Sequence, residues 1–168
     1  MISRKGQRHP SRGWVRWGQI PHPRRIGGQH LYLEPEPGWH LLEFPFRIVR
    51  DDGKVLGIIA YRHLSRLQAS AELGIELYPE YRGRGYGTEA VRTFLRYLFA
   101  SMGLRRVWLR VFADNEPALR TYRKCGFRPV GEGKAYLFFP CLVMAITREE
   151  FATHDGTDDG GGTDIGDG

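Results

Sequence analysis

Three glycines alternate with larger residues in the segment Arg82-Gly83-Arg84-Gly85-Tyr86-Gly87, which lies between a predicted strand and a predicted helix. Glycine tolerates positive φ angles, so this loop lets successive backbone N–H groups approach an anion. The helix that follows adds the positive end of its dipole, and the two arginines add side-chain charge. The segment is therefore either a diphosphate-binding loop or a tight turn from strand to helix. Its spacing fits neither a P-loop nor the Gly-x-Gly-x-x-Gly of a Rossmann fold.

Alternation and helical periodicity define the elements on either side of this loop. Residues 71–77 alternate as a half-buried strand does, with three apolar side chains on one face (Leu73, Ile75, Leu77) and three other residues on the opposite face (Glu72, Gly74, Glu76). After the loop, apolar residues recur at helical spacing until Gly103, where a helix stop is expected. This stripe consists of Ala90, Val91, Phe94, Leu95, Leu98 and Phe99.

The rest of the chain predicts further strands and one more helix. Residues 42–50 and 55–61 form a predicted hairpin, and residues 63–70 connect it to the strand 71–77. The next strand covers residues 106–112. Asn115 then caps a short helix that ends at Cys125, before Gly126. Residues 127–130 and 136–146 form the last two predicted strands.

Two segments together resemble the GNAT superfamily of N-acetyltransferases. The loop 82–87 is similar to the acyl-CoA-binding signature of that family, and Asn115-x-x-Ala118-x-x-x-Tyr122-x-Lys124-x-Gly126-Phe127 is similar to the helix and strand that follow it. The resemblance covers residues 41–146, most closely the bacterial branches related to ribosomal-protein acetyltransferases. It implies an α+β fold with a mixed, mostly antiparallel twisted sheet of about six or seven strands flanked by helices.

The resemblance also implies roles for individual residues toward acetyl-CoA. Backbone groups of residues 75–77 are expected to pair with the pantetheine arm and the acetyl carbonyl, and the loop amides to hold the diphosphate. Asn115 matches an asparagine that hydrogen-bonds the cofactor arm. The predicted cofactor-binding residues are Ile75, Glu76, Leu77, Arg82, Gly83, Arg84, Gly85, Tyr86, Gly87, Thr88, Asn115 and Tyr122.

Direct acetyl transfer needs a neutral amine, a polarised carbonyl and a proton for the leaving thiolate. Tyr122 matches the tyrosine that gives this proton in the family, although a helix tyrosine can also be a core residue. Glu72 and Glu76 are the predicted bases, and Glu72 lies about where several family members keep a general-base glutamate. Either can instead be a solvated or salt-bridged residue on the strand face. Ribosomal-protein acetyltransferases can carry a glutamate on the next strand, where this sequence has Arg110.

The start of the chain departs from the family pattern. Family members usually open with a strand and one or two helices that wall the acceptor pocket, and this wall commonly sets acceptor specificity. Here the first forty residues lack a helical stripe, and residues 31–33 are the candidate for the first strand. Trp39, His40 and Glu43 are candidates for the border of the acceptor site by position alone. The expected acceptor is a primary amine of a small molecule, a peptide or a protein.

Composition limits the class of protein. A chain of 168 residues with 41% hydrophobic and 26% charged residues predicts one globular domain. Its two cysteines, Cys125 and Cys141, form no disulfide framework and favour a reducing compartment, so a cytoplasmic protein is expected. The six histidines show no metal-ligand spacing, so no metal is expected. No segment reads as a secretory signal or a membrane helix, and a monomer or homodimer is expected.

Charge divides the chain into three predicted parts. Residues 1–30 carry seven basic residues and no acidic one and predict a poorly ordered arm. Residues 31–151 form the predicted acyl-CoA N-acyltransferase domain, and residues 152–168 a disordered acidic tail. The arm suggests an alternative function, namely a non-catalytic acyl-CoA sensor or a module that binds nucleic acid or another acidic partner.

Overall fold

The computed structural model describes residues 25–37, 42–135 and 138–158. Most of the predicted basic arm, together with Trp39 and His40, lies outside the described residues. The elements in chain order are β1 (Ile26–Gly27), β2 (Leu31–Pro35), β3 (Glu43–Arg50), β4 (Val55–Ser65), β5 (Ser70–Leu77), the short 3-10 helix η1 (Pro79–Tyr81), α1 (Tyr86–Arg96), the π-helical turn η2 (Tyr97–Ser101), β6 (Arg106–Val111), α2 (Glu116–Lys124), β7 (Arg128–Ala135), β8 (Phe139–Thr147) and α3 (Arg148–Asp158).

All the strands belong to one sheet, in the order β1-β2-β3-β4-β5-β6-β8-β7. Among the described strands only β5 and β6 run parallel, so the predicted mixed and mostly antiparallel sheet is confirmed. The sheet has eight strands rather than six or seven, because two short strands precede β3. The predicted strand at residues 31–33 is β2, and β1 pairs with it through Ile26 and Leu33, so the sheet begins inside the segment predicted to be an arm.

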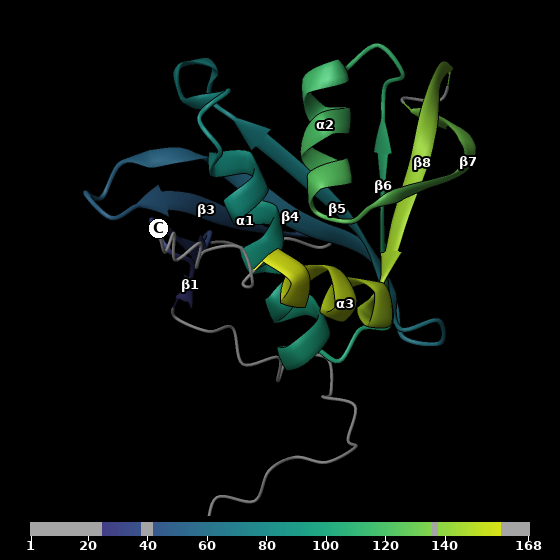
Figure 1. The fold of residues 1–168 in the computed structure, drawn as a ribbon, viewed down its shortest axis with the longest axis horizontal. Helices are drawn as coiled ribbons and strands as arrows, with labels where there is room; N and C mark the ends of the chain where they lie inside the picture. Colours follow the sequence, from purple (N-terminus) through teal and green to yellow (C-terminus); the bar gives the residue numbers. More distant parts are fainter. Residues whose placement is uncertain (1–24, 38–41, 136–137, 159–168) are drawn as a thin grey trace, which may run out of the picture.

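The junction between β5 and β6 is short. Only three residue pairs join the two strands, namely Ser70 with Arg106, Ala71 with Val107 and Glu72 with Trp108. Beyond Glu72, β5 continues to pair with β4, and beyond Trp108, β6 continues to pair with β8. The two strands therefore diverge, and in Figure 1 α2 lies in front of the place where they separate. In the described part of the chain, no strand pairs there with the backbone groups of β5 that face β6.

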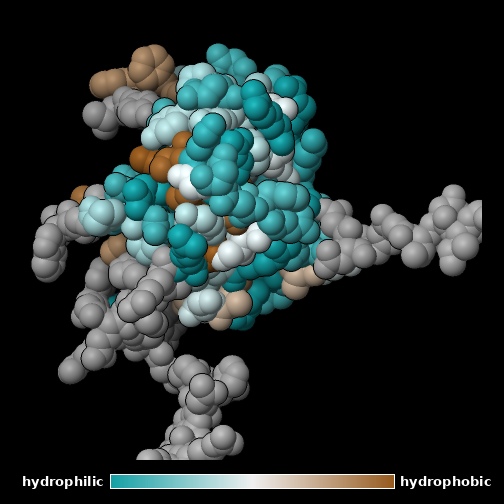
Figure 2. Space-filling model, turned by 90° about the vertical axis from the view of Figure 1, so that its left-hand side faces the viewer, coloured by the Kyte–Doolittle hydropathy of each residue, from teal (hydrophilic) through white to brown (hydrophobic). Residues whose placement is uncertain are grey.

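The helices lie on the same side of the sheet in Figure 1, and the main core fills the space between them and the sheet. Phe94 of α1 contacts Phe46 of β3 edge-to-face, with 5.1 Å between ring centroids. The predicted stripe of α1 is buried as expected, and the face of β5 that carries Leu73 belongs to the core. We call this side the helix face, and the opposite side, which carries Glu72, Gly74 and Glu76, the far face. Figure 2 shows a largely hydrophilic surface with small, separate groups of hydrophobic side chains.

Two predicted connections are wrong, because strands continue through them. The sequence predicts a loop at residues 63–65, but β4 extends to Ser65 with an irregularity in its pairing between Arg62 and Ser65. His63 lies at this irregularity with φ of 49°, an unusual angle for a residue other than glycine. Likewise β7 continues beyond Val130 to Ala135 and pairs along its length with β8.

The C-terminal segment also differs from the prediction, since residues 152–158 belong to α3 rather than to a disordered tail. Thr147 and Glu150 form a reciprocal capping box at the start of this helix. Phe151 packs on Phe99, and Asp155 accepts two hydrogen bonds of 2.8 Å from Arg96 of α1. These tertiary contacts hold a segment whose own sequence favours a helix only weakly. No helix among the described residues is long and apolar enough to cross a membrane.

Candidate active site

The glycine loop lies between η1 and α1, and its backbone angles suit an anion site. Gly83 and Gly85 have φ angles of 71° and 87°, a region that other residues rarely adopt. Gly85 is the N-cap of α1 and has no side chain to accept hydrogen bonds from the first-turn amides, so these donors remain available. Arg82 donates a 2.9 Å hydrogen bond from Nε to the carbonyl of Leu77, which ties the loop to the end of β5.

A cleft of about 540 Å³ opens on the helix face between this loop, the end of β5 and α2. It brings together most of the predicted cofactor-binding residues. These are Ile75, Glu76, Leu77, Arg82, Gly83, Gly85, Gly87, Thr88, Asn115 and Tyr122. The cleft thus joins the unpaired edge of β5 to the free amides at the start of α1, as a long ligand with a diphosphate group needs.

Tyr122 stands on α2 at the inner end of the cleft. Its side chain is buried and packs edge-to-face on Phe127, with 5.8 Å between ring centroids. Burial raises the pKa of Tyr122 to about 12, with a smaller contribution from Cys125, while the charge of Arg62 acts in the opposite direction. The phenol is therefore protonated at neutral pH and can donate a proton to a group in the cleft.

Asn115 lines the same cleft and also begins α2. Its Oδ1 accepts a hydrogen bond of 3.3 Å from the amide of Ala118, so it is the N-cap of the helix. This role orients α2 and with it Tyr122.

Glu72 is completely buried on the far face, at the last residue pair between β5 and β6. Arg110 donates two hydrogen bonds to its carboxylate, of 2.9 and 3.1 Å, and His63 Nδ1 lies 2.6 Å from Oε2. Arg62 Nε lies 3.4 Å from the same oxygen. Burial alone would raise the pKa of Glu72, but the bonds from Arg110 and His63 and the charge of Arg62 outweigh it and lower the pKa.

Glu76 lies four residues after Glu72, on the same face of β5, and has a different environment. It is exposed, it lines the cleft, and among the described residues no side chain forms an ion pair with it. The two predicted carboxylates thus have different environments, one saturated with cationic donors and the other open to solvent.

Comparison with known families decides what this arrangement belongs to. Residues 8–128 match the acetyltransferase (GNAT) domain family, which is more than half of the chain. The chain belongs to the GNAT acetyltransferase family. The match confirms the family-level resemblance, and the closer relation to ribosomal-protein acetyltransferases stays a prediction.

Characterised relatives of this GNAT domain act on different amines. It is 30% identical over 123 residues to the L-amino acid N-acetyltransferase AaaT of Escherichia coli strain K12, covering 70% of each chain. It is 34% identical over 85 residues to the spermidine N(1)-acetyltransferase of the same strain, covering 51% of this chain and 46% of the relative. The chain therefore spans about half the length of this second relative.

Solved structures confirm the fold of the GNAT domain. The spermidine N-acetyltransferase from Vibrio cholerae in complex with CoA and spermine superposes with a TM-score of 0.62 at 23% sequence identity, covering 67% of this chain and 69% of that one. The predicted acyl-CoA N-acyltransferase fold is thereby confirmed.

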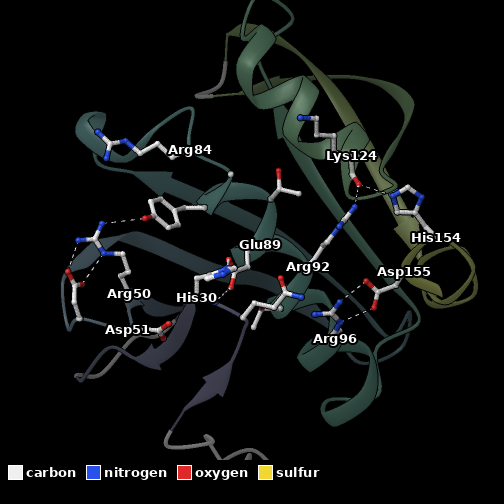
Figure 3. A pocket seen from close by; sticks show the side chains of 16 residues that line it. His30, Arg50, Asp51, Arg84, Glu89, Arg92, Arg96, Lys124, His154 and Asp155 are labelled. Atoms are coloured by element: carbon white, nitrogen blue, oxygen red, sulfur yellow. Dashed lines mark hydrogen bonds and ion pairs between the residues drawn. The ribbon is translucent and has the colours of Figure 1, made fainter. Parts of the chain in front are cut away.

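Two of the predicted cofactor-binding residues of the GNAT domain point elsewhere. Arg84 and Tyr86 line a second, wider cavity of about 1240 Å³ between the β3–β4 hairpin, α1 and α3 (Figure 3). Tyr86 accepts a hydrogen bond of 3.3 Å from Arg50 there. Arg82 lines the cleft and Arg84 the second cavity, with the positive φ of Gly83 between them, so the path of the backbone decides which side chain meets the cleft.

The prediction also missed the residues that surround Glu72. Arg62, His63 and Arg110 come from two neighbouring strands and meet at one carboxylate only because β4, β5 and β6 are adjacent. A signal existed in the alternation of β6, which places Arg110 on the same face as Arg106, away from the core residue Leu109.

Proposed function

We propose that the protein transfers the acetyl group of acetyl-CoA directly to a primary amine. The observation that carries this proposal is the cleft that joins three features, namely the free amides at the start of α1, the unpaired edge of β5 and the buried phenol of Tyr122. The family to which the chain belongs supports the same activity.

The cleft suits a thioester substrate that carries a diphosphate. The amides of residues 83–88 would bind the diphosphate, aided by the dipole of α1. The backbone groups of Ile75 and Leu77 that face away from β4 would pair with the amide-rich pantetheine arm, as an added strand would. Asn115, whose Oδ1 caps α2, retains its side-chain NH2 as a donor for the same arm.

We infer that Tyr122 protonates the leaving thiolate and that Glu76 accepts a proton from the acceptor ammonium. The amine nitrogen then forms a bond to the acetyl carbon, and the C–S bond breaks with its electron pair on sulfur, which takes the Tyr122 proton. A second proton leaves nitrogen and restores the phenol. Glu72 has its oxygens occupied by Arg110 and His63, so we assign it a positioning role instead of the general-base role that family analogy gave it.

The proposed acceptor is a small amine rather than a ribosomal protein. The relatives named above act on a polyamine and on amino acids, which favours the small amine. Arg110 also bonds Glu72 at the position where ribosomal-protein acetyltransferases can carry a glutamate. The two cysteines, Cys125 and Cys141, are buried and suit a reducing compartment, so we propose a cytoplasmic location as well.

A thermal-shift titration with acetyl-CoA, CoA and ADP tests the cofactor part of the proposal. Each ligand should raise the melting temperature, since a ligand at a hundred times its Kd adds about 2.7 kcal/mol to stability. Gly85→Glu places a carboxylate among the loop amides and should abolish the shift. Gly103→Glu is the matched control, because Gly103 has a similar φ of 71° and open space but lies beyond η2, away from the cleft.

The proposal fails if acetyl-CoA at millimolar concentration stabilises neither the wild type nor Gly103→Glu. It also fails if Gly85→Glu responds as strongly as the control. A positive result is followed by an assay of thiol release with a panel of amines, which tests transfer itself.

A further inference from the structure

The charged cluster on the far face lies beside the opening between β5 and β6. It consists of Arg62, His63, Glu72 and Arg110, and we call it the far-face cluster. Within it Arg110 is fully engaged, because Nε and Nη2 bind Glu72 and Nη1 donates to the carbonyl of Lys134. These bonds hold the carboxylate of Glu72 in place, and the charge of Arg110 alone compensates its negative charge.

Arg62 is held much less tightly. Its guanidinium makes two long ion pairs, 3.4 Å from Nε to Glu72 and 3.5 Å from Nη1 to Glu43, and Nε has no hydrogen-bond partner in the described part of the chain. The side chain is 37% exposed. An arginine can make five N–H donations, so the outer edge of this group retains unused donors.

The sequence of β5 leaves room for this guanidinium next to the opening. A Cβ atom on Gly74 would lie only 3.2 Å from Arg62 Nη2, so the guanidinium rests on the backbone where other residues would carry a side chain. Gly74 precedes Ile75, the first residue of β5 that lines the cleft. The charge of Arg62 also acts on the pKa of Tyr122, which stands on the other side of the opening.

A cation and an anion therefore flank the opening on the far face. Arg62 covers Gly74, and Glu76, with its exposed carboxylate, stands two residues further on. With acetyl-CoA in the cleft on the helix face, as proposed above, the acceptor would approach the acetyl group from the far face. Its ammonium would lie toward Glu76 and any anionic group toward Arg62.

Resting on the proposed function, we propose that Arg62 binds a carboxylate of the acceptor, and that the acceptor is a small amine with a carboxylate close to it, such as an α-amino acid. Arginine recognises carboxylates by paired hydrogen bonds, and Arg62, which makes only two long ion pairs, retains donors for them. A polyamine would instead bring a second ammonium group against the guanidinium, which opposes its binding.

The test measures thiol release from acetyl-CoA with the protein L-amino acids, with the carboxamide of each active amino acid, and with spermidine. The amino acids should be the better acceptors, with a KM on the order of 10-fold or more below that of their amides. Arg62→Gln should raise the KM for the amino acid on the order of 10- to 100-fold and leave the KM for its amide and for acetyl-CoA unchanged. Arg62→Lys should recover part of the loss.

Arg47→Gln is the matched control. Arg47 is an arginine of the neighbouring strand β3 with a similar exposed fraction of 38%, and it pairs with Glu34 and Glu36 instead of the cluster. It should leave the preference for acid over amide unchanged. The ratio of the KM for the amino acid to the KM for its amide distinguishes loss of carboxylate recognition from misfolding, because a damaged fold would reduce the acetylation of both acceptors equally.

The outcomes separate this proposal from the one on which it rests. If acetyl-CoA binds and spermidine or the amides are acetylated as well as the amino acids, carboxylate recognition is refuted and acetyl transfer stands. Carboxylate recognition is also refuted if acetyl-CoA binds and no amino acid is acetylated, or if Arg62→Gln affects acid and amide alike. If acetyl-CoA does not bind, the proposed function itself fails.

Discussion

Replacing Glu72 by glutamine should destabilise the protein, whereas the same change at Glu76 should not. Glu72 is completely buried and accepts hydrogen bonds from Arg110 and His63, with Arg62 at 3.4 Å. Glutamine has nearly the same shape but no charge, and its NH2 group would face cationic donors in place of an acceptor. Two guanidinium groups would then share one amide oxygen.

The magnitude follows from the burial of the partners. Removing one member of a fully buried ion pair costs about 3–5 kcal/mol. Here the side chains of Arg110 and Arg62 remain 32% and 37% exposed, so water can partly replace the lost carboxylate. We therefore expect the free energy of unfolding to fall by roughly 2–3 kcal/mol at neutral pH.

The pH dependence gives a second signature of the same interaction. The pKa of Glu72 is lower in the folded protein than its ordinary value, so the folded state binds this proton less readily than the unfolded state does. Its contribution to stability is thus complete above the ordinary pKa of glutamate and is lost as the pH falls through the lowered pKa. Glu72→Gln should remove this part of the acid destabilisation.

Urea denaturation followed by tryptophan fluorescence, at neutral and at acidic pH, measures both effects. Glu76→Gln is the control, because Glu76 lies on the same strand face without an ion pair among the described residues, and its stability should change by less than about 0.5 kcal/mol. Its turnover should fall instead, as expected of the proposed base. The reasoning is refuted if Glu72→Gln is as stable as the wild type, or if Glu72→Gln loses turnover at unchanged stability while Glu76→Gln stays active.

Two further substitutions test the cleft and the sheet beside it. Tyr122→Phe should lower kcat by roughly 10²–10⁴-fold with little change in the KM for acetyl-CoA, and an unchanged kcat would remove Tyr122 from the mechanism. Because the pKa of Tyr122 is about 12, wild-type activity should show no loss from phenol ionisation up to about pH 10. Gly57→Ala would place a Cβ 2.1 Å from the backbone oxygen of Glu76 and force β4 from β5, at a cost of roughly 2–4 kcal/mol in unfolding free energy. Gly27→Ala, with no atom within 4 Å, should stay within about 0.5 kcal/mol of the wild type, and equal stability of the two variants would contradict the clash.

The features that sequence reasoning predicted well are those that local chemistry determines. Positive φ angles at Gly83 and Gly85 follow from the residue type and the turn from strand to helix, and the burial of one face of α1 follows from its periodicity. The roles of Asn115 and Tyr122 toward the cofactor were predicted instead from the family resemblance, and the structure has both residues in the lining of the cleft.

The features that were missed depend on contacts between distant segments. The helix α3 has a sequence rich in aspartate, threonine and glycine, and it is held by Phe151 on Phe99 and by Arg96 on Asp155. The capping box of Thr147 and Glu150 was the only local signal for it. The environment of Glu72 likewise depends on the pairing of three strands, which alternation along a single strand does not reveal.

The short junction between β5 and β6 has a mechanical consequence. Strands β1–β5 and strands β6–β8 are each joined internally by antiparallel ladders, while three parallel pairs link one set to the other. The pairing between β5 and β6 is therefore the weakest link in the sheet, and it lies next to the glycine loop. A molecule bound to Ile75 and Leu77 on one side and to α2 on the other would bridge this junction. Acetyl-CoA would then hold the two parts of the sheet together as well as react. When CoA leaves at the end of each turnover, these contacts between the two parts would be lost.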